Sequence, residues 1–179
     1  MRKEIRIAGF GGQGVGLAGY ILGKALAIYD GLEAVMTQSY GPEARGGASN
    51  ASIVISDHDI AYPFVEQPDY LIALSQEAYT RYQPAVAQEG MIIIDSDLVE
   101  PFNDQKHLTI PATQIAQDLG NRIAANMVML GYFSAASKVV SIQAINQSVE
   151  SSVRPHTKDL NLEAVRAGLN FAMEMEVGL

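Results

Sequence analysis

The sequence predicts an α/β protein: a Rossmann-like open, mostly parallel sheet with flanking helices and a helical C-terminal part. Three observations lead to this fold class. An apolar, strand-like segment runs directly into the glycine-rich turn GFGGQG near the start of the chain. Short apolar runs then alternate with segments of helical period as far as Pro111. Beyond Pro111 the pattern is helical, and such an order of segments is typical of a sheet covered by helices.

The expected strands are short runs rich in Ile, Val and other apolar residues. The run MIIID is apolar up to its last residue, as expected for a buried parallel strand. In chain order the expected strands are Glu4–Phe10, Leu32–Ser39, Ala51–Ser56, Tyr70–Leu74, Met91–Asp95 and His107–Ile110.

The expected helices show apolar residues at helical spacing. The first carries a strip of small residues, Gly16, Gly19 and Gly23, which allows a neighbour to approach its backbone closely. Asn121 is the expected N-cap of the fourth helix, and Asn161 (or Asp159) that of the last. The fourth helix is apolar on nearly all sides, so it is either the central helix of the domain or also a contact with a partner. The expected helices are Val15–Tyr29, Gln76–Ala87, Ala112–Leu119, Arg122–Ser137, Ser141–Ser152 and Asn161–Val177.

Length and composition indicate one globular domain, residues 1–179, with no repeat or linker. The net charge of −8 and the scattered basic residues argue against nucleic acid and anionic membranes as partners. The chain has no cysteine, so it forms no disulfide and offers no thiolate to an iron–sulfur cluster or zinc. No signal peptide or membrane span is evident, and we expect a cytoplasmic protein.

The turn GFGGQG fits the pattern Gly9-x-Gly11-x-x-Gly14 between a strand and a helix. Gly9 is expected to permit the tight turn, Gly11 the approach of a pyrophosphate, and Gly14 close helix–strand packing. A dinucleotide site also needs an acidic residue at the end of the second strand, where this chain has Gln38. Three interpretations therefore stay open for the turn: another phosphate-bearing ligand, a partner chain, or packing alone.

A second glycine-rich stretch, SYGPEARGG, frames Glu43 and Arg45 with glycines and Pro42. This composition suits a shaped recognition loop, although the two charged residues could simply pair with each other on the surface. Asp95 and Asp97 follow a buried strand at the edge where ligands bind in such folds, but helix capping explains them equally well. The three histidines lie in unrelated contexts, so we assign no catalytic residue and no metal ligand.

Three motifs in this order resemble the gamma subunit of 2-oxoacid:ferredoxin oxidoreductases: GFGGQGV, SYGPEARGG and the late NMVMLGYF. The resemblance covers essentially the whole chain, including the closing NLEAVRAGLNFA. The form of the second motif is more similar to the 2-oxoglutarate and branched-chain enzymes than to the pyruvate enzymes.

The resemblance implies a reaction that converts a 2-oxoacid into an acyl-CoA and CO2 and reduces ferredoxin. It places thiamine diphosphate and the iron–sulfur clusters in the partner alpha and beta subunits, and leaves open a ferredoxin-like delta subunit. It also suggests that this chain helps to hold coenzyme A. We infer that Gly11, Gly12, Gln13 and Gly14 offer N–H groups to the pyrophosphate and that Arg45 contacts a phosphate or the catalytic subunit. The alternatives are a branched-chain or pyruvate enzyme, or a free-standing Rossmann-like nucleotide-binding protein.

Overall fold

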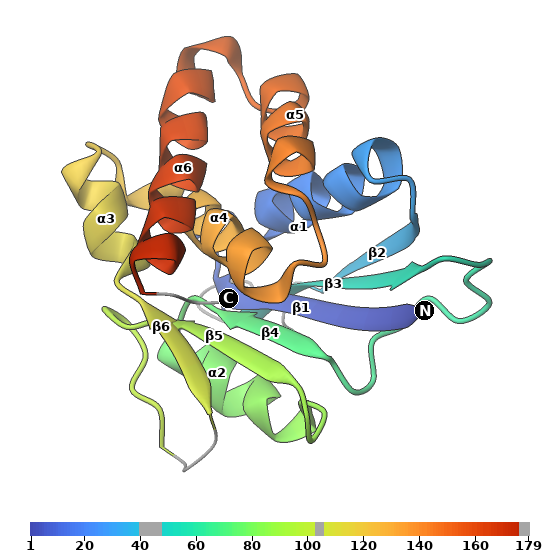
Figure 1. Ribbon diagram of the computed structural model, residues 1–179. Coiled ribbons are helices and arrows are strands. Elements are labelled where there is room, and N and C mark those ends of the chain that lie inside the picture. Colours follow the sequence, from blue (N-terminus) through green and yellow to red (C-terminus); the bar gives the residue numbers. More distant parts are fainter. Residues whose placement is uncertain (40–47, 103–105, 176–179) are drawn as a thin grey trace.

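The protein is described by a computed structural model that covers residues 1–39, 48–102 and 106–175. Within these residues the chain forms one six-stranded sheet in the order β2-β3-β1-β4-β5-β6 (Figure 1). The strands are β1 (Arg2–Phe10), β2 (Glu33–Ser39), β3 (Ala48–Ser56), β4 (Tyr70–Ala73), β5 (Met91–Asp95) and β6 (His107–Ile110).

The predicted open α/β sheet is confirmed, with one strand in a direction that the sequence analysis did not specify. β1, β4, β5 and β6 pair in parallel, whereas β3 is antiparallel to both of its neighbours, β1 and β2. Only residues 40–47 connect β2 to β3, which is too short for the crossover that a parallel neighbour requires. The antiparallel β3 therefore follows from the length of this connection.

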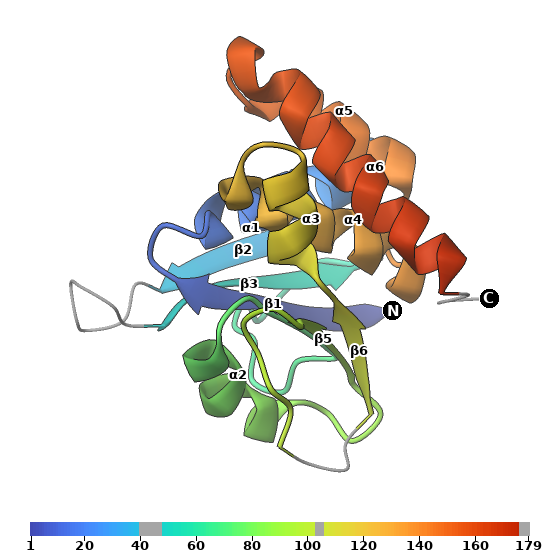
Figure 2. The ribbon, with the colours of Figure 1, turned by 90° about the vertical axis from the view of Figure 1, so that its left-hand side faces the viewer.

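Helices cover both faces of the sheet unequally. The larger helical layer, α1 with α3 to α6, lies on one face, and α2 lies on the other (Figures 1 and 2). A π-helical segment, η1, extends α1, and short 3-10 segments accompany α2, α4 and α6. The bounds are α1 (Val15–Lys24), η1 (Ala25–Tyr29), α2 (Gln76–Tyr82), η2 (Gln83–Ala85), α3 (Ala112–Asp118), η3 (Arg122–Ala124), α4 (Ala125–Ser137), α5 (Ile142–Ser152), η4 (Pro155–Thr157) and α6 (Lys158–Glu174).

The main hydrophobic core lies between the sheet and the larger helical layer. Alternate residues of β1, such as Ile5 and Ile7, point into it beside α1 and α4. The residues of α4 are almost all buried, since the sheet lies on one side and α6 packs on the other. The prediction that this helix is the central one is therefore confirmed.

The contact between α4 and α6 is close because each helix carries a glycine at the crossing. A Cβ atom added to Gly131 would overlap the carbonyl oxygen of Val165, and one added to Gly168 would overlap that of Val128. No larger residue fits at either position without moving the helices apart.

The predicted helix caps have different outcomes. Asn121 accepts a hydrogen bond from the N–H of Ile123 and caps η3, as predicted. The prediction of Asn161 or Asp159 as the N-cap of the last helix is wrong, because both lie within α6, which begins at Lys158 with Thr157 as its N-cap. The Asn161 side chain donates to Thr157 O. None of the helices in the described part of the chain is long and apolar enough to cross a membrane.

Candidate functional site

The glycine turn lies at the carboxyl end of β1, where ligands bind in open α/β sheets. Gly14 is the N-cap of α1, and both it (φ 71°) and Gly12 (φ 94°) adopt the left-handed conformation that glycine tolerates without strain. The first-turn N–H groups of α1 have no partners within the helix and are directed towards the carboxyl end of β1. The local sequence thus presents a helix N-terminus of the kind that can hold an anion.

Gln13 braces the turn through its backbone and its side chain. Its backbone N–H donates to Phe10 O (3.2 Å), and its side-chain oxygen accepts from Phe10 N (2.6 Å). Its amide nitrogen donates to Leu74 O (2.7 Å), which ties the turn to the end of β4. Gln13 therefore supports the loop, and its role as a phosphate donor stays a prediction.

The four glycines of the turn divide into two pairs. A Cβ at Gly9 would lie 3.1 Å from both Leu74 Cβ and Val15 Cγ2, and one at Gly14 would overlap the Asn126 amide. Packing therefore leaves no free space for a side chain at Gly9 or Gly14. Gly9 lies within β1, and Gly14 packs against Asn126 of α4, whereas the sequence predicted that Gly14 packs against a strand. By contrast, a Cβ at Gly11 or Gly12 would meet no atom within 4 Å. The backbone is open at these two positions.

A cavity of about 330 Å³ opens beside the exposed pair Gly11 and Gly12. Its walls combine apolar side chains, including Leu74 and Leu98, with the guanidinium-bearing Arg122 of η3. Arg122 is exposed and forms no ion pair with the described residues, so its charge is available to an anion. Sequence reasoning missed Arg122 because it is far from the turn in the chain.

Topology brings Arg122 to the turn. Asn126, at the start of α4, donates from its side-chain nitrogen to Gly14 O (3.1 Å) and accepts from Met127 N (2.8 Å). This buried amide fixes the N-terminus of α4 against the N-terminus of α1. The segment that precedes α4, with Arg122, therefore lies at the rim of the glycine turn.

The acidic pair at the end of β5, Asp95 and Asp97, caps a helix. The buried Asp95 accepts from Thr113 Oγ1 (2.6 Å) and from Asp97 N (3.1 Å), and Asp97 accepts from Gln114 N (2.7 Å). Burial raises the pKa of the Asp95 carboxyl, and the hydrogen bond from Thr113 opposes this rise. Of the two interpretations left open, the structure supports capping of α3.

Gln38 at the end of β2 lies against α1: a Cβ at Gly16 would overlap its side-chain amide. The position that holds the ribose-binding acid of dinucleotide enzymes is thus occupied by a packing contact. Glu43 and Arg45 fall outside the described residues. Among the residues that are described, no group of three or more histidine, aspartate and glutamate side chains is placed to hold a metal ion.

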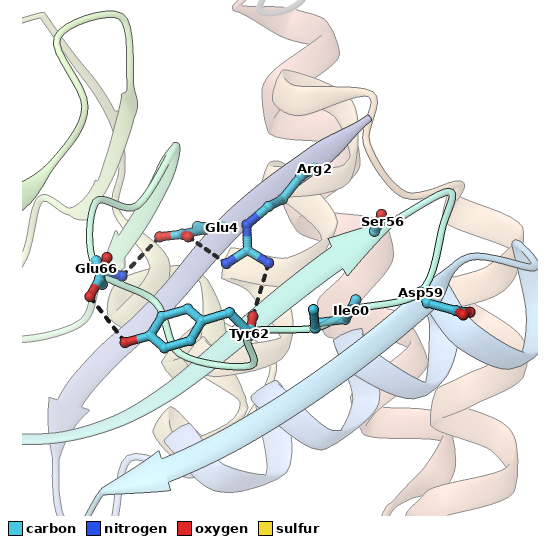
Figure 3. Close-up of a pocket in the computed structure, with 8 residues that line it drawn as sticks. Arg2, Glu4, Ser56, Asp59, Ile60, Tyr62 and Glu66 are labelled. Carbon is cyan, nitrogen blue, oxygen red and sulfur yellow. Dashed lines mark hydrogen bonds and ion pairs between the residues drawn. The ribbon is translucent and has the colours of Figure 1, made fainter.

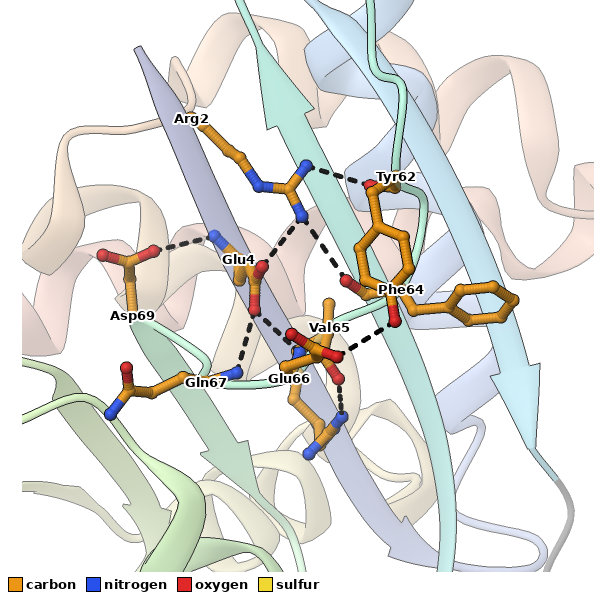
Figure 4. Close-up of polar contacts among 9 residues, drawn as sticks. Arg2, Glu4, Tyr62, Phe64, Val65, Glu66, Gln67 and Asp69 are labelled. Carbon is orange, nitrogen blue, oxygen red and sulfur yellow. Dashed lines mark hydrogen bonds and ion pairs between the residues drawn. The ribbon is translucent and has the colours of Figure 1, made fainter.

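A further hollow, of about 420 Å³, lies at the amino end of β1 beneath the segment 57–69 (Figure 3). Arg2 donates to Tyr62 O (3.0 Å), Phe64 O (3.4 Å) and Glu4 Oε1 (2.9 Å), as Figure 4 shows. Glu4 also accepts from the backbone N–H groups of Glu66 (2.9 Å) and Gln67 (3.0 Å).

These contacts fix the segment 57–69 against the sheet. Arg2 pairs with Glu4, and the other charged lining residues, Asp59 and Glu66, are acidic, so the hollow does not suit an anionic ligand. It also lies at the opposite end of β1 from the glycine turn. We therefore identify the glycine turn with Arg122 as the candidate site.

The chain is similar to proteins of one family. A family model described as "Pyruvate ferredoxin/flavodoxin oxidoreductase" matches residues 4–171. The 2-oxoglutarate synthase subunit KorC of Methanothermobacter thermautotrophicus is 50% identical, over 97% of this chain and 97% of that protein.

Two solved structures have the same fold. The gamma subunit of a keto/oxoacid ferredoxin oxidoreductase from Geobacter sulfurreducens superposes with a TM-score of 0.87 at 40% identity, over 97% of this chain and 98% of that one. The 2-oxoglutarate:ferredoxin oxidoreductase of Magnetococcus marinus, solved with 2-oxoglutarate, coenzyme A and succinyl-CoA bound, gives a TM-score of 0.86 at 23% identity. The match covers 97% of this chain but 31% of that one, so there the fold is part of a longer chain.

Proposed function

The chain belongs to the pyruvate ferredoxin/flavodoxin oxidoreductase family, and from this membership we propose that it is the gamma-type subunit of a 2-oxoglutarate:ferredoxin oxidoreductase. The complex oxidatively decarboxylates 2-oxoglutarate to succinyl-CoA and transfers the electrons to ferredoxin. Identity of 50% to a 2-oxoglutarate synthase subunit, along nearly the full length of both chains, favours this substrate over branched-chain 2-oxoacids and pyruvate.

The chain serves the reaction without catalysing it alone. With no cysteine anywhere in its sequence, it has no thiolate with which to ligate an iron–sulfur cluster. The clusters therefore belong to the alpha and beta partners, or to a ferredoxin-like delta subunit where the complex has one. From the family membership we assign thiamine diphosphate to the partner subunits as well. Electron transfer and decarboxylation take place in those subunits.

The contribution of this chain is to hold the phosphates of coenzyme A. The observation that carries this proposal is the open backbone at Gly11 and Gly12, which faces a cavity that is also lined by Arg122, a residue without an ion pair among the described residues. Backbone N–H groups at a helix N-terminus and a guanidinium are the groups that bind pyrophosphate best. The apolar walls beside them suit the uncharged pantetheine arm.

The test uses the assembled complex with Arg122→Gln in this chain. Loss of a charge-assisted hydrogen bond costs about 1.5–3 kcal/mol, so coenzyme A should bind about 10- to 150-fold more weakly, as measured by calorimetry. Arg166→Gln removes an exposed arginine of α6 that does not line this cavity, and it serves as the matched control. Unchanged coenzyme A affinity in an intact Arg122→Gln complex would refute the phosphate role.

The substrate is tested separately. The wild-type complex should reduce ferredoxin with 2-oxoglutarate much faster than with pyruvate or a branched-chain 2-oxoacid. A preference for one of the latter would reject the substrate assignment while leaving the subunit role in place.

A further inference from the structure

The segment 57–69 holds two aromatic side chains at the surface. Tyr62 is 48% exposed and Phe64 is 54% exposed, and their rings meet edge to face with centroids 5.5 Å apart. The guanidinium of Arg2 donates to the backbone carbonyl of each, and Glu4 accepts from the N–H groups that follow them in the chain (Figure 4). The backbone that carries the two rings is therefore fixed to β1.

A fixed, half-exposed aromatic pair suits an interface better than a surface left in water. Apolar surface stabilises a protein only when it is removed from water, so the exposed part of each ring contributes little to the fold. A partner that covers the rings gains this contribution at a small cost in conformational entropy, because the backbone beneath them is already held. Rigid aromatic side chains dominate the binding energy of many interfaces.

The hollow beside this pair is acidic. Asp59 and Glu66 line it, both are exposed, and neither forms an ion pair with the described residues. Tyr62 lines the same hollow, and its hydroxyl donates to Glu66 Oε1 (3.0 Å), which holds that carboxylate at the wall (Figure 3). Carboxylates next to an aromatic ring are the groups that attract a guanidinium or an ammonium. The hollow thus suits the side chain of an arginine or a lysine.

Charge also decides which kind of molecule supplies that side chain. Nucleic acid and anionic membranes are repelled by the acidic lining. A second copy of this chain carries the same net charge of −8, so electrostatics disfavours pairing between copies. The occupant favoured by these observations is a different protein that presents a basic side chain next to an apolar one.

We propose that Tyr62, Phe64 and the acidic hollow form a docking surface for a partner subunit of the complex. An arginine or lysine of that subunit enters the hollow, and an apolar side chain beside it covers the two rings. This inference rests on the proposed function, and it assigns a surface to the partner contact. The surface lies at the amino end of β1, so it is separate from the glycine turn at the other end.

The experiment dilutes the assembled complex and measures by mass photometry the Kd with which this chain is retained. Phe64→Ala should raise the Kd about 30-fold or more, as expected for an aromatic anchor. The double variant Asp59→Asn, Glu66→Gln should raise it about tenfold at low salt, and its Kd should depend less on salt than that of the wild type. Glu163→Gln removes an exposed acid of α6 that does not line the hollow, and should leave the Kd within about twofold.

Circular dichroism of each isolated variant confirms that it is folded, and the coenzyme A affinity of the assembled variants should equal that of the wild type. If Phe64→Ala and the double variant are retained as well as the wild type, the docking surface is wrong although the proposed function stands. If only Phe64→Ala weakens retention, no basic side chain enters the hollow and the proposal fails. Variants that change only the self-association of the isolated chain would assign the surface to a second copy. If the wild-type chain does not join alpha and beta subunits at all, the proposed function and this inference both fail.

Discussion

Replacing Gly131 by alanine tests the packing that places the site, because α4 carries both the core and the N-terminal Asn126 contact. A Cβ at this position would overlap Val165 O and lie 2.8 Å from the Val165 carbonyl carbon. Relief requires α4 and α6 to separate by about 1 Å, which loosens a closely packed crossing. Overpacking of this kind lowers the free energy of unfolding by about 1–3 kcal/mol or more, whereas the higher helix propensity of alanine raises it by about 0.5–1 kcal/mol.

We therefore expect a net loss of about 2 kcal/mol in the free energy of unfolding, or about 4–8 °C in Tm for a chain of this length. Urea denaturation of the isolated chain, followed by circular dichroism, measures it. Gly23→Ala is the matched control: this glycine also lies in a helix, but its added Cβ meets nothing within 4 Å. That variant should gain about 0.5–1 kcal/mol. A Gly131→Ala protein as stable as wild type would refute the reasoning.

Two further predictions concern charged groups. Burial raises the pKa of Asp95 in the folded state, so the native carboxyl binds its proton at a higher pH than the unfolded one. The free energy of unfolding of the wild type, relative to that of Asp95→Asn, should therefore increase as the pH falls from about 7 towards about 4. Thermal melts of both proteins across that range check the sign, and a difference that shrinks on acidification would contradict it. Arg2→Ala should speed amide exchange in residues 62–67, measured by mass spectrometry, with a change in global stability below about 1 kcal/mol. Unchanged exchange there would show that Arg2 does not hold the segment.

Strands and helices were predictable where a local pattern decides them. Met91–Asp95 matches β5 because an apolar run bounded by polar residues and glycine has few alternatives. β3 was predicted to begin at Ala51 but begins at Ala48, since Ser49 and Asn50 looked like loop residues. In the fold Ser49 donates to Gly9 O (3.3 Å) and Asn50 to Tyr82 Oη (2.8 Å), so distant partners allow polar residues into a buried strand.

The site was predictable only in its contiguous part. The glycine turn could be recognised because its residues are neighbours in the sequence. Arg122 could not, because it follows α3 in the chain and reaches the turn only once α4 is packed against α1. A usable signal exists for Arg122, which stands between the N-cap Asn121 and a helix that is apolar on nearly all sides. A cation at that position lies at the edge of the sheet whenever the helix is central.

Gly11 distinguishes the interpretations of the turn that the sequence left open. Packing explains Gly9 and Gly14, and backbone conformation explains Gly12, but Gly11 has neither a positive φ nor any atom within 4 Å of an added Cβ. The fold of this chain therefore does not require glycine there, whereas a ligand or partner pressed against the backbone does. Gly11→Ala should leave the free energy of unfolding within about 0.5 kcal/mol of wild type and weaken coenzyme A binding to the complex about tenfold or more. Weaker assembly of the complex at unchanged coenzyme A affinity would instead show that the turn contacts a partner chain. A change in the free energy of unfolding alone would show that Gly11 serves packing only.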